Sequence, residues 1–358
     1  MLRRSLLFLS LAALGALSDR ALRACLWPLT APRLVGRVGQ DLVVAQASPD
    51  GSRVAGLRSL GSERWSLTVW DTASGRELLS PRPVPHPPGT TNPLAWSPDG
   101  QWVAVGSAGE VSLWEVDRNR QQVFKAEYLV REVRFSGDWL LARCDNALFV
   151  WNWKRGRLLR RLGQDHLLAA DLNQSAAVLA AASLQDSIRL YSLPDGRPLK
   201  TLPAGPATVN LDFVRDGQLL AAGFRFRNDR SKDCALLYDW RQGRTATRAT
   251  EPDLVGFSTS RDGRRLLTRG PQGGHIWDDQ GACLREFDMP ALITDSLSPD
   301  GVRVASLHNH SRQVVIWQAD APEARTSLPS QHTPFRFGFL AGGRVQLLDG
   351  ACSVYQLP

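Results

Sequence analysis

Val69-Trp70-Asp71, Leu113-Trp114-Glu115, Val150-Trp151-Asn152 and Leu190-Tyr191-Ser192 are the first four copies of one short pattern, an aliphatic residue followed by an aromatic residue. The pattern returns as Leu237-Tyr238-Asp239, Ile276-Trp277-Asp278, Ile316-Trp317-Gln318 and Val354-Tyr355-Gln356. Successive aromatic residues lie between 37 and 47 positions apart. A period near forty residues is typical of proteins that repeat one supersecondary unit. We call the aromatic position of each copy the aromatic slot.

Two turn signals accompany the aromatic slot in most units. Ser48-Pro49-Asp50-Gly51 separates two short apolar stretches, and the same turn recurs as Ser97-Pro98-Asp99-Gly100 and Ser298-Pro299-Asp300-Gly301. Proline presets the backbone at the second turn position, aspartate can bond its own backbone, and glycine accepts the left-handed conformation. A second turn ending in Gly-Arg follows the slot, as in Gly75-Arg76 and Gly196-Arg197. Each unit is therefore predicted to form four short antiparallel strands.

These residues resemble the WD40 family and its bacterial relatives with Ser-Pro-Asp-Gly turns, over residues 33–358. The resemblance implies an all-β fold with a single β-propeller. The eight aromatic slots predict eight blades, and seven blades is the alternative if the short last unit packs as an appendage. The Gly-His pair that opens many WD40 units is absent, since His86, His166 and His332 lack that context. The hydrogen-bonded tetrad of strict WD40 blades is therefore not expected.

The last unit supplies only three strand-like stretches, Phe335–Leu340, Arg344–Leu348 and Ser353–Leu357. The segment Arg33–Val38 is a spare strand-like stretch that precedes the first unit. A blade without its outer strand leaves backbone donors and acceptors exposed at its edge. We therefore expect the N-terminal strand to pair with the end of the chain and close the ring.

Residues 1–18 are predicted to be a signal peptide or N-terminal anchor, and residues 19–32 a linker. Arg3-Arg4 precede a short apolar run, Ser5–Leu17, and small residues follow it. That order is typical of a secretory signal, while the run is shorter than the roughly 20 residues of a membrane span. We expect export to the cell envelope or periplasm, with a membrane tether as an option. The alternative is a cytoplasmic protein that retains this segment.

The net charge is +8 and comes almost wholly from arginine, because only four lysines are present. Such a surface suits acidic protein partners, phosphate or an anionic membrane. The arginines are spread through all units, however, which also fits a general preference for arginine. Of the 5 cysteines none forms a Cys-x-x-Cys pair, so no zinc site of that kind is expected. No recognised nucleic-acid-binding module is present, and we expect no nucleic-acid partner.

No phosphate-binding loop, zinc-protease helix, nucleophile elbow or EF-hand occurs. We therefore predict no catalytic residue, cofactor or metal. Asp71 with Gly75 and Asp239 with Gly243 fit part of the docking motif of quinoprotein propellers, but the expected tryptophan is missing. His308-Asn309-His310 could place two imidazoles on one side of a strand, although a polar loop is the simpler interpretation.

One rim of the predicted propeller gathers arginine and aromatic residues in the loops between second and third strands. The predicted partner-binding residues are Arg58, Arg64, Trp65, Phe224, Arg225, Phe226, Arg227, Arg230, His308, His310 and Arg312. Guanidinium groups beside aromatic rings suit acidic or aromatic partners. The alternative is that Phe224 and Phe226 pack within their blade while the arginines are solvated.

The predicted function is a non-enzymatic protein–protein interaction scaffold, formed by a monomeric ring. The alternative is a propeller enzyme or a cofactor-binding, quinoprotein-like protein with its site in the central channel. A channel lined by converging carboxylates, histidines or arginines would favour the alternative. A channel lined by backbone and small aliphatic side chains would favour the scaffold.

Overall fold

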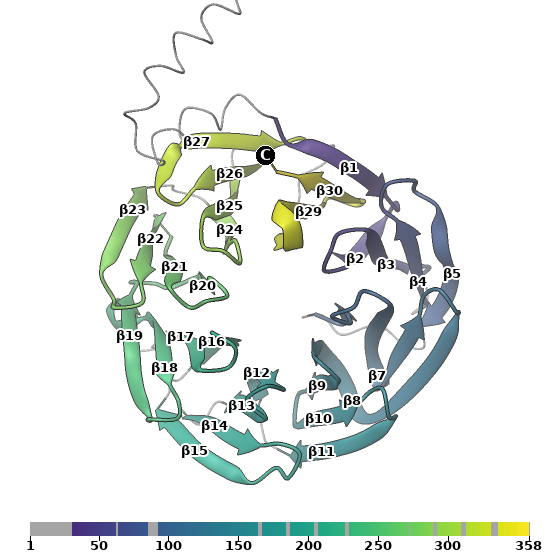
Figure 1. Ribbon diagram of the computed structural model, residues 1–358, viewed down its shortest axis with the longest axis horizontal. Coiled ribbons are helices and arrows are strands. Elements are labelled where there is room, and N and C mark those ends of the chain that lie inside the picture. Colours follow the sequence, from purple (N-terminus) through teal and green to yellow (C-terminus); the bar gives the residue numbers. More distant parts are fainter. Residues whose placement is uncertain are drawn as a thin grey trace, which may run out of the picture.

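The computed structural model places antiparallel strands in a ring around a central axis (Figure 1). It describes residues 31–357, except for 62–63, 85–91, 164–166, 184–186, 204–206, 226–228, 272, 289–291, 309–312 and 331–335. Within this part of the chain the elements are the strands β1 to β30 and two short 3-10 turns, η2 (Arg230–Lys232) and η3 (Ala341–Gly343). The predicted all-β fold is confirmed. The predicted signal peptide or anchor and most of the linker fall outside the described residues.

The repeat units follow one another around the ring, and we number them by their aromatic slots. The strands of units one to three are β2 (Leu42–Ala47), β3 (Arg53–Ser59), β4 (Trp65–Asp71), β5 (Glu77–Val84), β6 (Leu94–Trp96), β7 (Trp102–Glu115), β8 (Arg120–Ser136), β9 (Trp139–Cys144), β10 (Ala147–Asn152) and β11 (Arg157–Gly163). Those of units four and five are β12 (Leu167–Asn173), β13 (Val178–Ser183), β14 (Ser187–Ser192), β15 (Pro198–Pro203), β16 (Ala207–Val214), β17 (Leu219–Arg225), β18 (Cys234–Asp239) and β19 (Arg244–Thr250).

The remaining strands belong to units six to eight. They are β20 (Gly256–Thr259), β21 (Arg265–Arg269), β22 (Gly273–Asp278), β23 (Cys283–Asp288), β24 (Leu292–Leu297), β25 (Arg303–His308), β26 (Val314–Gln318), β27 (Ala321–Leu328), β28 (Arg336–Leu340), β29 (Arg344–Leu348) and β30 (Cys352–Gln356). In units one, four, five, six and seven the first strand lies nearest the axis and the last strand on the perimeter (Figure 1).

The ring consists of seven hydrogen-bonded sheets, so the propeller has seven blades when sheets are counted. Six sheets have four strands, and the sheet with the order β11-β10-β9-β8-β7-β6 has six. This larger sheet holds units two and three, because β8 pairs with β7 through one part of its length and with β9 through the other. Asn92 also forms a parallel bridge with Glu132. Seven was the alternative count, and the eight aromatic slots reduce to seven sheets through this fusion.

The N-terminal strand closes the ring as predicted. β1 (Arg33–Val38) pairs with β30 in antiparallel register, from Arg33 opposite Gln356 to Val38 opposite Cys352. It lies on the perimeter beside β30 (Figure 1), which completes the sheet β1-β30-β29-β28. Gly36 lies against unit one, where an added Cβ would come within 1.6 Å of the Thr72 carbonyl oxygen. Only glycine allows the closing strand to approach unit one this closely.

The aromatic slots lie on the third strand of each unit, except in unit two, where Trp114 lies near the end of the long strand β7. Trp70 lies opposite Val54 and Trp317 opposite Val304, and both pairs contribute to the buried core. Tyr238 adds a hydrogen bond, because its hydroxyl donates to the Pro203 carbonyl oxygen at 2.5 Å. The slots therefore pack neighbouring sheets together and, in this case, tie a unit to the connection that leads into it.

Arginines join neighbouring units on the face that carries the Ser-Pro-Asp-Gly turns, which we call the turn face. Arg265 begins the second strand of unit six, and its guanidinium donates to the Gly301 carbonyl oxygen at 2.9 Å and to Asp320 Oδ2 at 3.0 Å, both in unit seven. Equivalent clamps join Arg53 to Gly100 and Asp117, and Arg215 to Asp262 and Asp279. These three arginines therefore have a structural role at the contacts between units.

Candidate functional site: the connection face and the channel

The opposite face carries the loops between second and third strands and the connections between units, and we call it the connection face. The predicted partner-binding residues that the structure describes belong to it by topology. Phe226, Arg227, His310, Arg312 and the side chains of Arg230 and His308 lie outside the described residues. The described ones come from opposite sides of the ring, so they do not form a single patch.

Two of the described predictions need correction. Phe224 is 1% exposed and packs edge-on against Tyr238, with ring centroids 6.4 Å apart, so it belongs to the core and not to the surface. Arg225 donates to the carbonyl oxygens of Leu254 and Val255, both at 2.6 Å. Its guanidinium therefore fastens β17 to the connection between units five and six. The alternative in which aromatic residues pack within the blade holds for Phe224.

The other described rim residues remain near the surface of unit one. Arg58 donates through Nε to the Gln40 carbonyl oxygen at 3.0 Å, which again fixes a connection between units. Arg64 is exposed and Trp65 is half-buried at the start of β4. Leu60, in the same loop, is 49% exposed. This loop therefore offers apolar and cationic groups to a partner.

A hydrogen-bonded chain in unit six was not predicted from the sequence. Trp277 Nε1 donates to Thr268 Oγ1 at 2.8 Å, and Thr268 Oγ1 donates to Glu251 Oε2 at 2.7 Å. His275 Nδ1 lies 2.7 Å from the same Glu251 oxygen. The chain resembles the tetrad of strict WD40 blades, which we did not expect, but here a glutamate occupies the connection and the histidine lies on β22. The signal for it was His275, two residues before the aromatic slot.

In unit seven the described residues keep only the first link of this chain, the hydrogen bond from the tryptophan to the hydroxyl group. Trp317 Nε1 donates to Ser306 Oγ at 3.1 Å. In the other units the residue at the place of Thr268 and Ser306 has no hydroxyl group, and these residues are Gly56, Val105, Ala142, Ala181, Ala222 and Leu347. The extended chain is therefore particular to unit six among the described residues.

Replacing Thr268 with valine is expected to lower the free energy of unfolding by about 1–3 kcal/mol, because Trp277 and Glu251 each lose a buried partner. Ser306→Ala is the matched variant in unit seven and removes a single link, with an expected loss of about 1 kcal/mol. Urea unfolding monitored by tryptophan fluorescence measures both. Equal losses in the two variants would contradict the extended chain.

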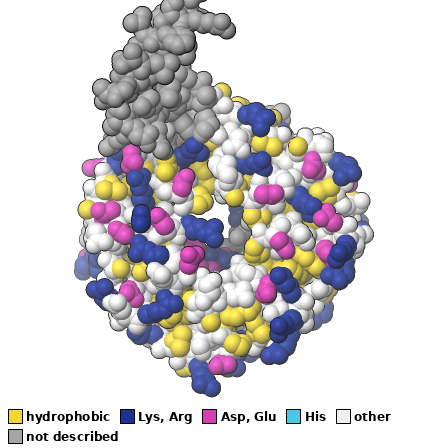
Figure 2. Space-filling model, viewed as in Figure 1, with side chains coloured by type: hydrophobic (Ala, Val, Ile, Leu, Met, Phe, Trp, Pro, Cys, Tyr) yellow, Lys and Arg dark blue, Asp and Glu magenta, His cyan; other side chains and the backbone are white. Residues whose placement is uncertain are grey.

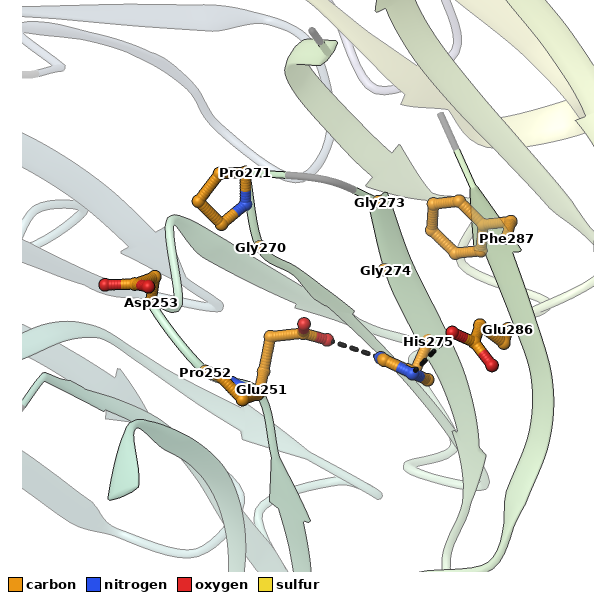
Figure 3. Close-up of a pocket in the computed structure, with 10 residues that line it drawn as sticks. All are labelled: Glu251, Pro252, Asp253, Gly270, Pro271, Gly273, Gly274, His275, Glu286 and Phe287. Carbon is orange, nitrogen blue, oxygen red and sulfur yellow. Dashed lines mark hydrogen bonds and ion pairs between the residues drawn. The ribbon is translucent and has the colours of Figure 1, made fainter. Parts of the chain in front are cut away.

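A pocket of about 630 Å³ opens beside this chain on the connection face (Figure 3). Its lining residues are Glu251, Pro252, Asp253, Gly270, Pro271, Gly273, Gly274, His275, Glu286 and Phe287. We call it the unit-six pocket. Glu251 lies at its base and is 5% exposed, whereas the Glu286 side chain is 79% exposed at its mouth, 3.9 Å from His275 Nε2. The pocket therefore combines carboxylates at two depths with apolar and glycine-rich walls.

Charged side chains also converge on the central channel. Arg134 on β8 donates to Glu132 Oε1 at 2.7 Å, to Asp212 Oδ1 at 2.9 Å and to Asn210 Oδ1 at 3.3 Å, and it lies 3.4 Å from Asp171 Oδ1. Basic and acidic side chains surround the central hollow in Figure 2. Arg134 thus links the inner strands of units three, four and five.

The groups around Arg134 are paired with further residues. Arg143 donates to Glu132 Oε2 at 3.0 Å, and Arg336 on β28 donates to Asn92 Oδ1 at 2.7 Å. Burial opposes the charge of Glu132, but Arg134 and Arg143 outweigh it and hold the pKa of Glu132 below its usual value. The channel has the charged lining that the alternative function predicted, and much of this lining is engaged in ion pairs.

Folding disfavours the ionised form of the Asp171 carboxyl group. Burial raises the pKa of Asp171 to about 6, against the opposing effect of Arg134. A group whose pKa is higher in the folded state contributes stability below its unfolded pKa, and this contribution is lost as the pH rises through the folded pKa. At pH 7.5 the ionised Asp171 therefore destabilises the fold.

Asp171→Asn is expected to raise the free energy of unfolding at pH 7.5 by about 1–2 kcal/mol, with a smaller gain at pH 5 and none below about pH 4. Asparagine keeps an oxygen for the Phe213 N–H, which donates to Asp171 Oδ2 at 2.7 Å. Asp145→Asn is the control with the opposite sign, because the hydrogen bond from Arg131 lowers the pKa of Asp145. Denaturant titrations at the three pH values test this, and a destabilised Asp171→Asn protein at pH 7.5 would refute it.

The structure offers little for metal or thiol chemistry. Among the described residues, no three histidine, cysteine, aspartate or glutamate side chains are placed to hold a metal ion. Four cysteines are free thiols, of which Cys144, Cys234 and Cys352 are buried and Cys283 is exposed. Burial raises the pKa of Cys144 to about 12, so its thiolate is suppressed at neutral pH.

The ring of antiparallel sheets, the equivalent aromatic slots and the recurring turns define a WD40-like β-propeller. The family model "WD domain, G-beta repeat" matches residues 94–115. The WD repeat-containing protein SL1-17 of Schistosoma mansoni is 33% identical over 87 residues, which cover 22% of this chain and 28% of that protein. The resemblance to WD40 repeats is therefore confirmed at the level of the repeat.

Solved structures confirm the fold over most of the chain. The C-terminal WD40 domain of Sif2 has a TM-score of 0.69 at 16% identity and covers 92% of this chain and 99% of its own. A chain of the mitotic checkpoint complex has a TM-score of 0.58 at 17% identity, covering 75% and 90%. Hydrazine synthase of Kuenenia stuttgartiensis has a TM-score of 0.55 at 16% identity, covering 81% and 97%. At these identities the similarity concerns the fold alone.

Proposed function

We propose that this protein is a non-enzymatic protein-interaction scaffold that binds its partner on the connection face. WD40 propellers typically serve as interaction scaffolds, and one structural neighbour comes from a multiprotein assembly, the mitotic checkpoint complex. The observation that supports the proposal most strongly is the unit-six pocket, a hollow of about 630 Å³ on the face where the sequence predicted partner binding. Leu60 and Val255, which are 49% and 36% exposed, add apolar contacts on the same face.

Affinity capture with face-specific variants tests this proposal. The connection-face variant carries Leu60→Asp and Val255→Asp, and the control carries Leu158→Asp and Leu199→Asp on outer strands, where the leucines are 47% and 48% exposed. All four positions are exposed, so both double variants should fold. We expect the connection-face variant to lose the partners of the wild-type protein and the control to keep them. Loss in the control alone, or in neither variant, would contradict the proposal.

The second candidate function is a propeller enzyme or cofactor carrier with its site in the channel. It is favoured by the convergence of charged groups on Arg134 and by a neighbouring hollow of about 460 Å³, which Asp212, Asn210 and Ser258 help to line. The similarity to hydrazine synthase places a propeller of this kind in an enzyme. Equilibrium dialysis against a metabolite mixture, read by mass spectrometry, separates the two candidates. A small molecule retained by the wild type and lost by Asp212→Ala would favour the channel.

For location, we propose export to the cell envelope through residues 1–18, with the propeller held outside the cytoplasm. Support comes from the sequence alone, where Arg3-Arg4 precede the apolar run Ser5–Leu17. In the part of the chain that the structure describes, none of the helices has the length and apolarity to cross a membrane. Mass spectrometry of the mature N-terminus is the test. An intact Met1 on protein recovered from the cytosol would contradict export.

A further inference from the structure

We propose that the unit-six pocket binds the guanidinium group of an arginine side chain of the partner protein. This inference rests on the proposed function, because it names the chemistry by which a partner would be recognised on the connection face. The unit-six pocket lies between the connection that precedes β20 and the ends of β21, β22 and β23 on the connection face (Figure 3). It is therefore separate from the channel and from the loop of unit one.

The charge of the unit-six pocket is opposite to that of the chain as a whole. The chain carries a net charge of +8, yet the carboxylates of Glu251 and Glu286 line the pocket and no lysine or arginine is among its described lining residues. The nearby Arg225 is occupied by the Leu254 and Val255 carbonyl oxygens. A local field of this sign favours a cationic group over an acidic or neutral one.

Glu251 provides the strongest evidence for a ligand. It is 5% exposed, and the hydrogen bonds from Thr268 and His275 both go to Oε2. Among the described residues no donor reaches Oε1, which points into the unit-six pocket (Figure 3). Oε1 is open to the pocket, and a cationic donor that enters would form a charge-assisted hydrogen bond with it.

Gly270 keeps this oxygen accessible. A Cβ at position 270 would lie 2.9 Å from Glu251 Oε1 and 3.0 Å from the Pro252 carbonyl oxygen. Any larger residue would therefore press against the carboxylate and cover it. The glycine leaves room for a planar group to approach Oε1 from the mouth of the unit-six pocket.

The walls favour arginine over lysine. Phe287 and Pro271 offer apolar surface against which a flat guanidinium and its aliphatic stem can pack. Glu286 stands at the mouth with 79% of its side chain exposed, on the other side of the His275 ring from Glu251, and adds negative charge at the entrance. Lysine presents a compact, strongly hydrated ammonium group that gains less from packing against such walls.

The test uses the full propeller and blocked pentapeptides of glycine with a central arginine, lysine or glutamine, measured by isothermal titration calorimetry. We expect the arginine peptide to bind roughly ten-fold more tightly than the glutamine peptide, which corresponds to about 1.4 kcal/mol. Glu251→Gln removes the charge, and Gly270→Ala keeps the charge but covers Oε1. Both variants are expected to reduce binding of the arginine peptide roughly ten-fold. The control is Glu127→Gln, which removes an exposed ion pair with Arg161 and should leave binding unchanged.

Two results would overturn the inference. One is equal binding of the arginine and glutamine peptides by the wild type, and the other is unchanged binding in both pocket variants when their circular dichroism melts match the wild type. If the connection-face variant loses the partners in affinity capture but the arginine peptide does not bind the wild type, this inference falls and the proposed function stands. If the connection-face variant keeps the partners, the proposed function falls instead.

Discussion

Arg134→Met is expected to lower the free energy of unfolding at pH 7.5 by about 3–5 kcal/mol, because three carboxylates then face one another without their central cation. Arg134 now donates to Glu132 and Asp212 and lies 3.4 Å from Asp171 Oδ1. Removing it takes away a charge that lowers all three pKa values, so those of Asp171 and Asp212, which burial already raises, rise further, and that of Glu132 rises as well. The destabilisation should therefore shrink as the pH falls toward 5, because the carboxylates become protonated and their repulsion disappears.

The control for this prediction is Arg131→Met. Arg131 pairs with Asp145 at 2.9 Å, where the side chains are 31% and 56% exposed, so its loss should cost at most about 1 kcal/mol. Guanidinium chloride obscures such charge effects by screening, so urea unfolding at pH 7.5 and pH 5 is the measurement. Equal losses for the two arginine variants, or a loss in Arg134→Met that does not depend on pH, would show that the channel cluster does not connect the units.

Gly36→Val is expected to detach the closing strand and to lower the free energy of unfolding by more than about 3 kcal/mol. The added Cβ would lie 1.6 Å from the Thr72 carbonyl oxygen, a backbone atom that cannot move aside without distorting unit one. Detachment leaves the backbone of β30 unpaired along the edge that β1 now covers, and removes the ion pair of 2.8 Å between Arg37 and the buried Asp349. Hydrogen exchange at residues 352–356 should then become much faster.

Gly338→Ala is the control for the closing strand. It lies on β28 in the same sheet, and an added Cβ there would meet only Gln346 Nε2, at an ordinary 3.7 Å. We expect wild-type stability and unchanged exchange in β30 for this variant. Slow exchange in β30 of Gly36→Val would mean that the ring closes without β1.

The repeat and the closure of the ring by the N-terminal strand could be predicted because both depend on local sequence patterns. Each aromatic slot follows an aliphatic residue and precedes a turn, and Arg33–Val38 has the length and character of a strand. The fusion of units two and three could not be predicted, because it depends on β8 running without a break from its pairing with β7 into its pairing with β9. Such continuity leaves no periodic signal, and it is the reason why eight slots form seven sheets.

The hydrogen-bond partners of the arginines also could not be predicted from the sequence. Arg265 and Arg225 look alike as arginines near strand ends, yet the first clamps a turn of unit seven and the second binds the Leu254 and Val255 carbonyl oxygens. Carbonyl acceptors exist at every residue, so a sequence cannot show which of them an arginine will reach. For this reason the partner-binding prediction placed structural arginines on the surface.

The unit-six pocket was missed for a related reason. Glu251 and His275 are 24 residues apart and meet only because the connection from β19 folds back over β22. Neither residue belongs to a motif, and the one histidine cluster in the sequence is the pair at 308 and 310. A hollow of this kind becomes visible only when the loops of one unit are seen together.

Photocrosslinking in cells that express the protein tests partner binding on the connection face most directly. A photoreactive amino acid is placed at Val255 on the connection face or at Leu199 on the outer strand of unit four, where the native side chains are 36% and 48% exposed. We expect a discrete crosslinked partner from Val255 that is absent from Leu199. A partner crosslinked from Leu199 and not from Val255 would contradict this expectation.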